Sequence, residues 1–189
     1  LRLLVGVAQK CGRGERAHHE RAVFLYELTV LFCYLEIRRN ETGCRNSAEA
    51  DDDFRLDQLN LLPLHEAGYK GRGMRIGVVD GGFYRANSML SLPQEQCLGY
   101  ADLTDDEEDM LSHAGSHGTM CLSTLMATQD DYTGAATEAN YYLFRTEEEY
   151  TESPKEIDNW VAAIEMADSM GLHIVSSSLG YTTFDDAEM

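Results

Sequence analysis

A short apolar segment, Met74 to Val79, follows a glycine-rich stretch and ends on an aspartate, Asp80. A continuous apolar run of this length, bounded by glycines, predicts a strand that is buried on both faces, as in a parallel sheet. The segments Asn140 to Arg145 and Leu172 to Ser178 have the same character and predict two further strands. A parallel sheet needs a crossover connection between its strands, and this requirement limits the folds available to the chain.

Helical patterns occupy the intervals between the predicted strands. Residues Gly118 to Ala127 are apolar and rich in small side chains, which suits a buried helix, and Lys155 to Met170 repeats apolar residues at helical spacing. Strands that alternate with helices predict an α/β fold in three layers around a mainly parallel sheet. Sites in such folds form at the carboxyl ends of the strands, where Asp80 and Ser178 are both expected.

Charge is distributed unevenly along the chain. The net charge is −18, with eight basic and six acidic side chains in residues 1–50 but seven basic and 27 acidic ones in residues 51–189. This change predicts an unassigned N-terminal segment at 1–50, a prodomain remnant or a linker, followed by a domain at 51–189. So acidic a domain repels phosphate groups, and nucleic acid is therefore not expected as a partner.

A membrane span is not expected either. The apolar run from Ala22 to Ile37 contains Glu27 and is shorter than the roughly 20 residues that a spanning helix requires. Nothing in the sequence indicates an oligomeric state.

Cysteine and histidine spacing gives no metal site. The five cysteines form no Cys-x-x-Cys pair, which argues against both a disulfide framework and a zinc knuckle. His113 and His117 are spaced as metal ligands can be, but a third ligand at fitting spacing is missing. No metal ligand is therefore assigned.

Asp80 and His117 are the candidate catalytic residues. A carboxylate at the end of a buried strand and a histidine opening a helix suit a charge-stabilised imidazole base, because the carboxylate fixes the tautomer of the ring and stabilises its protonated form. Taken alone, each residue is more often a cap or a packing residue. Cys121, one helical turn after His117, is interpreted as a packing residue rather than a nucleophile. Ser176, Ser177 and Ser178 lack the tight turn that exposes a nucleophilic serine.

Four motifs in order resemble the subtilisin-like serine peptidases, the subtilases. Ile76 to Gly82 is similar to the aspartate segment of that family, and His117-Gly118-Thr119 is similar to its histidine segment. Gly134 to Ala139 resembles the turn before its next strand, and Ser178-Leu179-Gly180 resembles its substrate-binding segment. The resemblance runs from about Gln58 to Asp185 and corresponds to the first half of the family's catalytic domain.

The resemblance implies a partial subtilisin-like fold and serine endopeptidase activity. Asp80 would orient the imidazole, His117 would act as general base and acid, and Ser178, Leu179 and Gly180 would pair with the backbone of a peptide or protein substrate. Secretion, or a place in the cell envelope, is implied by the resemblance alone.

The sequence departs from the family pattern chiefly by what it lacks. It contains neither a Gly-Thr-Ser-x-Ala nucleophile segment nor the asparagine segment that supplies an oxyanion donor. We interpret the chain as a fragment truncated before the catalytic serine, and we expect it to be inactive as it stands. No cofactor is assigned, and calcium is left open because the stretch Thr128 to Thr133 is shorter than the calcium loop of many relatives. The alternative is a non-catalytic subtilase-like or flavodoxin-like binding module.

Overall fold

A computed structural model describes residues 2–5, 56, 59–105, 109–112, 115–129, 132–148 and 153–181, with the backbone alone described for 2–5. Their centre is a five-stranded sheet in the order β1-β7-β2-β6-β3, in which every pairing is parallel. The strands are β1 (Arg2–Val5), β2 (Arg75–Asp80), β3 (Cys97–Asp102), β6 (Asn140–Arg145) and β7 (Ile174–Ser177). A small antiparallel ribbon, β4 (Thr128–Gln129) with β5 (Tyr132–Thr133), lies apart from this sheet.

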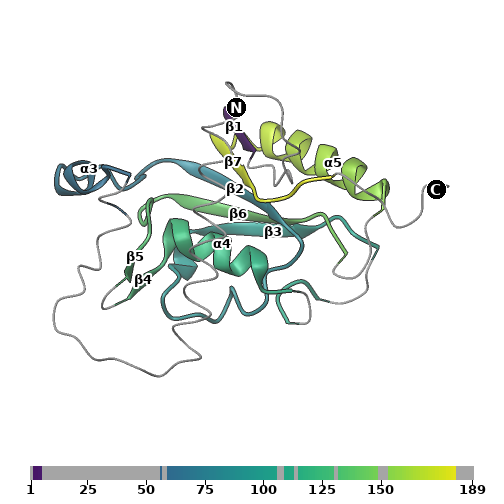
Figure 1. Ribbon diagram of the computed structural model, residues 1–189, viewed down its shortest axis with the longest axis horizontal. Helices are drawn as coiled ribbons and strands as arrows, with labels where there is room; N and C mark the ends of the chain where they lie inside the picture. Colours follow the sequence, from purple (N-terminus) through teal and green to yellow (C-terminus); the bar gives the residue numbers. More distant parts are fainter. Residues whose placement is uncertain are drawn as a thin grey trace, which may run out of the picture.

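Two helices cover the opposite faces of the sheet, which gives the α/β fold its three layers (Figure 1). They are α4 (His117–Met126) and α5 (Lys155–Ser169). A short helix α3 (Leu62–Glu66) precedes β2, and a 3-10 turn, η1 (Gln94–Gln96), precedes β3. The three-layer arrangement around a mainly parallel sheet confirms the fold class predicted from the alternation of strands and helices.

The side chains of β2 point alternately to the two faces of the sheet and contribute to two separate apolar clusters. Ile76 and Val78 pack in one cluster with Leu122 and Met126 of α4. Val79 packs in the other, which includes Ala163 and Ala167 of α5. Because successive side chains of a strand point to opposite faces, one apolar strand serves both helices. β2 is therefore buried on both sides, as its continuous apolar sequence predicts.

Most element boundaries agree with the sequence patterns. β6 matches the predicted segment residue for residue, and α4 and α5 lie within one residue of their predicted ends. β7 is shorter than predicted, because its pairing covers Ile174–Ser177 and leaves Ser178 beyond the strand. The leucine pattern at 55–67 suggests a longer helix than α3, in which Pro63 stands in the first turn, where a missing N–H is tolerated.

Two strands of the sheet are absent from the sequence-based prediction. β3 forms one edge, with Leu98 and Tyr100 exposed. β1 lies within the unassigned segment 1–50 and pairs with β7 from Arg2 opposite Ile174 to Val5 opposite Ser177. The sheet thus has five parallel strands rather than three, and the outer edge of β7 is covered by the N-terminal strand.

Some predictions fall on residues that the structure does not describe. The apolar run Ala22 to Ile37 and His113 lie outside the described residues. Within the described part of the chain, no helix has both the length and the apolar character needed to cross a membrane.

Candidate active site

Asp80 ends β2 at the carboxyl edge of the sheet and is 1% exposed. A buried carboxylate requires hydrogen-bond donors, and Oδ1 accepts one from the backbone N–H of Gly81 at 2.9 Å. The backbone carbonyl of Asp80 accepts a hydrogen bond from the N–H of Thr146 at 3.1 Å. The carboxylate is therefore held by its own turn, and the backbone of Asp80 is held by the residue that follows β6.

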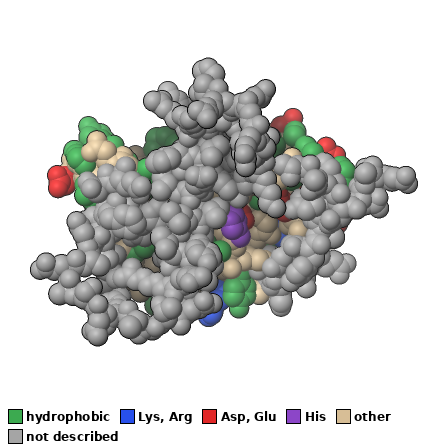
Figure 2. All heavy atoms as spheres, viewed as in Figure 1, with side chains coloured by type: hydrophobic (Ala, Val, Ile, Leu, Met, Phe, Trp, Pro, Cys, Tyr) green, Lys and Arg blue, Asp and Glu red, His purple; other side chains and the backbone are tan. Residues whose placement is uncertain are grey.

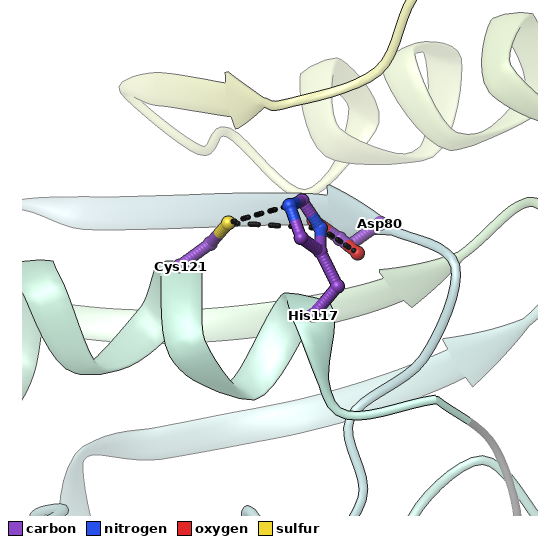
Figure 3. A group of neighbouring side chains, drawn as sticks. All are labelled: Asp80, His117 and Cys121. Atoms are coloured by element: carbon purple, nitrogen blue, oxygen red, sulfur yellow. Dashed lines mark hydrogen bonds and ion pairs between the residues drawn. The ribbon is translucent and has the colours of Figure 1, made fainter. Parts of the chain in front are cut away.

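His117 is the first residue of α4, and its ring meets Asp80 directly (Figure 3). Nδ1 lies 2.9 Å from both Oδ1 and Oδ2 of Asp80. Since a carboxylate can only accept, Nδ1 is assigned as the N–H donor in this contact. The Asp80 side chain is 1% exposed but that of His117 is 42% exposed, so the pair joins a buried acid to an accessible imidazole. A histidine side chain is visible at the surface near the centre of the face in Figure 2.

The close approach of α4 to β2 depends on Gly118. A Cβ atom added at Gly118 would lie 2.5 Å from the carbonyl oxygen of Gly82 and 2.8 Å from Cβ of Asp80. The N–H of Gly118 instead donates to that same carbonyl at 3.0 Å, and the hydroxyl of Thr119 donates to the carbonyl of Tyr84 at 2.9 Å. The Gly-Thr dipeptide after the histidine therefore brings the helix against the turn that follows Asp80.

Cys121 completes a group of three potential metal ligands with Asp80 and His117. Their donor atoms lie within 4.8 Å of one another, and Cys121 is 3% exposed. Sγ is 3.8 Å from Nδ1 and 3.9 Å from Nε2, so it lies on the lone-pair axis of neither nitrogen. Coordination of a metal ion by all three residues would require the His117 ring to rotate, and this rotation would break its hydrogen bond to Asp80. The arrangement fits a packed thiol beside an acid–base pair better than a preformed metal centre.

The segment Ser178-Leu179-Gly180 follows β7 at the same edge of the sheet as Asp80. The pairing of β7 with both of its neighbours ends at Ser177. Leu179 is 9% exposed, Ser178 is half-buried and Gly180 is exposed. The hydroxyl of Ser177 accepts a hydrogen bond from Nε1 of Trp160 at 3.0 Å, which ties this serine to α5.

Acidic and phenolic groups lie around the loop that leaves β6. Both carboxylate oxygens of Glu156, which is 2% exposed, accept backbone hydrogen bonds, from Glu148 at 3.0 Å and from Ser153 at 3.2 Å. The hydroxyl of Tyr181 donates to the backbone carbonyl of Glu156 at 3.4 Å. Burial, followed by the charge of Glu147, raises the pKa of Tyr181. At neutral pH this tyrosine is therefore a neutral donor close in sequence to Ser178-Leu179-Gly180.

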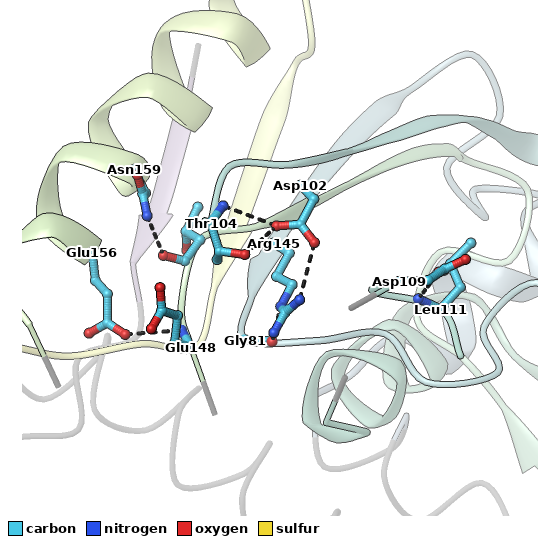
Figure 4. A network of polar contacts seen from close by, with 10 residues as sticks. Gly81, Asp102, Thr104, Asp109, Leu111, Arg145, Glu148, Glu156 and Asn159 are labelled. Atoms are coloured by element: carbon cyan, nitrogen blue, oxygen red, sulfur yellow. Dashed lines mark hydrogen bonds and ion pairs between the residues drawn. The ribbon is translucent and has the colours of Figure 1, made fainter. Parts of the chain in front are cut away.

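Arg145 was not identified from the sequence as a site residue. It ends β6 with 1% exposure, and its guanidinium contacts the turn after Asp80 (Figure 4). A signal was present, because a charged residue that closes an apolar strand stands at the edge where sites form. The same signal identified Asp80 at the end of β2. At the end of β6, the apolar pattern predicted the strand, but its last residue was not considered as a site residue.

Comparison with known proteins supports the fold. No family model matches the sequence, and no curated protein matches it either. Among solved structures, MycP1 from Mycobacterium smegmatis matches with a TM-score of 0.52 and 19% identity over 70% of this chain and 37% of that one. MycP1 from the ESX-1 type VII secretion system matches with a TM-score of 0.52 and 19% identity over 70% of this chain and 38% of that one.

The chain shares the subtilisin-like α/β fold of these structures. This confirms the fold that the four motifs predict. At 19% identity the likeness extends to the fold alone, and the chain spans less than two fifths of the length of the MycP1 structures that it matches.

Proposed function

We propose that the chain carries the acid–base half of a subtilisin-like serine endopeptidase. Asp80 orients the imidazole of His117, and His117 takes a proton from a nucleophilic hydroxyl and returns it to the leaving amine. The nucleophile and the oxyanion donor come from sequence outside these 189 residues, because neither family segment occurs in them. The substrate is a peptide or protein chain whose backbone lies along Ser178, Leu179 and Gly180.

One observation carries this proposal: the contact of 2.9 Å between Nδ1 of His117 and the carboxylate of Asp80. A buried carboxylate on one ring nitrogen of an accessible imidazole is the arrangement that a histidine base requires. The pair lies at the carboxyl edge of a parallel sheet, where α/β enzymes bind their substrates. A binding module has no need of a histidine aligned on a buried acid.

The fold match supports a location as well as an activity. MycP1 comes from the ESX-1 type VII secretion system. We therefore propose that the protein acts in the cell envelope or outside the cell.

The test uses the complete natural coding region that contains these 189 residues. The encoded protein is incubated with an unstructured protein substrate and with a fluorophosphonate that labels activated serines. We expect labelling of one serine downstream of Met189, and we expect His117→Ala to abolish both labelling and cleavage. A native reading frame that ends at Met189, or a full product without labelling or cleavage, would support the binding module instead.

A further inference from the structure

Arg145 places a positive charge between two acidic strand ends. It is the last residue of β6, and its side chain is 1% exposed. The strand register aligns it with Asp80 of β2 on one side and with Asp102 of β3 on the other. A guanidinium does not lose its proton at any ordinary pH, so its burial is tolerated only where its N–H groups are bonded and its charge is compensated.

The guanidinium reaches β3 and the turn after β2 with different nitrogens. Nε donates to the backbone carbonyl of Gly81 at 3.1 Å, and Nη1 donates to Oδ2 of Asp102 at 3.2 Å (Figure 4). Asp102 is fixed in turn, because its Oδ1 accepts from the N–H of Thr104 at 3.0 Å and from the hydroxyl of Thr104 at 2.7 Å. The planar guanidinium therefore bridges an anchored carboxylate on β3 and the turn after β2.

The bonded carbonyl belongs to the residue that orients Asp80. Gly81 donates its N–H to Oδ1 of Asp80 at 2.9 Å and accepts from Arg145 through its carbonyl. The Asp80–Gly81 peptide that supplies this donor is held on its other side by the bond from Thr146 N–H to the Asp80 carbonyl at 3.1 Å. The bond from Arg145 fixes the next peptide, Gly81–Gly82, and so limits the backbone rotation at Gly81 that would otherwise tilt the donor away from the Asp80 carboxylate.

We propose that Arg145 is a positioning residue for the Asp80–His117 pair, acting through the carbonyl of Gly81 and anchored by Asp102. The inference adds to the proposed function and rests on it for its catalytic meaning, but the geometry that Arg145 maintains can be measured without any peptidase activity. A lysine cannot replace it, because a single ammonium nitrogen does not reproduce two N–H groups directed at acceptors on β3 and in the turn after β2.

The experiment reads the Asp80–His117 contact directly by NMR. The protein encoded by the complete natural coding region, labelled with ¹⁵N-histidine, is examined for the strongly downfield Nδ1 proton of a histidine bonded to a carboxylate, with His117→Ala to assign the signal. The variants are Arg145→Met and Arg145→Lys. Arg75→Met is the matched control, since it makes the same substitution at the opposite, half-buried end of β2. Circular dichroism establishes that each variant is folded.

We expect the downfield signal in the unsubstituted chain and in Arg75→Met, its loss in Arg145→Met and an upfield shift in Arg145→Lys. An unchanged signal in folded Arg145→Met would overturn the inference and leave the proposed function intact. If Arg145→Met does not fold, the folded Arg145→Lys variant decides in the same way. Absence of the signal from the unsubstituted chain would show that the hydrogen bond between His117 and Asp80 does not form, and this result would overturn both proposals.

Discussion

Asp80 and His117 depend on each other because neither is useful in the proposed reaction alone. The carboxylate is 1% exposed and cannot reach a substrate, so it can act only through the imidazole. The imidazole, without a fixed partner on Nδ1, would sample both tautomers and lose its stabilised cation. Their 2.9 Å contact would let them act as one unit in that reaction.

This unit predicts strongly non-additive kinetics in the complete enzyme. We expect Asp80→Asn and His117→Ala each to lower kcat by about 10⁴-fold or more, the scale established for triads of this kind. The kcat of the double variant should be only slightly lower than that of the less active single variant. Steady-state hydrolysis of a peptide substrate measures these values. A single variant that keeps near-normal turnover would exclude its residue from the mechanism.

Gly118 provides a stability test beside the same site. Gly118→Ala places a Cβ 2.5 Å from the carbonyl oxygen of Gly82, a backbone atom that cannot move without disturbing the turn after Asp80. We expect a loss of about 3 kcal/mol in the free energy of unfolding, at the upper end for overpacked sites. Urea unfolding measures the loss.

The control is Gly81→Ala, whose new Cβ would have its nearest neighbour at 3.7 Å, which is ordinary contact. This change should alter stability by about 0.5 kcal/mol or less, as is usual where nothing is crowded. Equal effects of the two substitutions would show that close packing at Gly118 is not the reason for a glycine there.

At the scale of elements, the sequence predicts those strands and helices whose burial leaves a periodic or continuous apolar pattern. β2, β6, α4 and α5 are buried on one or both faces and were located to within a residue or two. The position of Asp80 and His117 at the ends of such elements made the candidate pair predictable as well.

β1, β3 and Arg145 were not predicted, for two physical reasons. β3 is an edge strand whose exposed and half-buried residues alternate around Gly99, so its pattern resembles that of a loop. β1 is defined by pairing with β7 at the far end of the chain, and no local pattern records a tertiary contact. The role of Arg145 likewise depends on the register of three strands, which follows from the assembled sheet and not from the sequence of β6.

Tyr141 on β6 links the buried sheet to stability at alkaline pH. Burial, followed by interactions with Cys97, raises the pKa of Tyr141, which is 1% exposed. A raised pKa means that the folded state holds the phenolic proton more tightly than the unfolded state does. This contribution to stability is complete below about pH 10, the ordinary tyrosine pKa, and is lost as the pH rises further, by up to about 1.4 kcal/mol per pH unit.

Above about pH 10, the free energy of unfolding should therefore fall less steeply with rising pH in Tyr141→Phe than in the unsubstituted chain. Urea unfolding at a series of alkaline pH values gives the slope. Tyr69→Phe, at a tyrosine that is 71% exposed, is the control and should leave the slope unchanged. Parallel slopes for the unsubstituted chain and Tyr141→Phe would contradict the assignment.

Pairing of β1 with β7 predicts a role for the first residues in the stability of the sheet. Removal of residues 1–5 uncovers the outer edge of β7, and each ladder hydrogen bond that is lost costs about 1 kcal/mol. An open edge strand also templates association with other chains. We expect a lower Tm and concentration-dependent aggregation, measured by calorimetry and light scattering. A truncated chain with unchanged Tm and scattering would show that β1 is dispensable.

At the scale of the whole molecule, the pair alone does not make a peptidase. Loss of a single oxyanion donor costs about 3 to 4 kcal/mol of transition-state stabilisation in enzymes of this type, and the chain has no recognisable nucleophile segment. We expect the isolated 189 residues to cleave no unstructured protein and to bind no fluorophosphonate at serine. Labelling at a serine that disappears in His117→Ala would mean that an unrecognised nucleophile lies within the chain.

The pairing of Arg2 with Ile174 joins residues 172 positions apart. In Figure 1 the N-terminus lies at β1, beside the last strand of the sheet. A ribosome releases Arg2–Val5 well before Ile174–Ser177, at about 5 to 20 residues per second, so the partner of β1 does not yet exist while the residues between them are translated. β1 thus waits for a partner that is synthesised long after it. During that interval its backbone is available to other strands, and a chaperone that holds nascent chains would be expected to raise the yield of correctly folded protein.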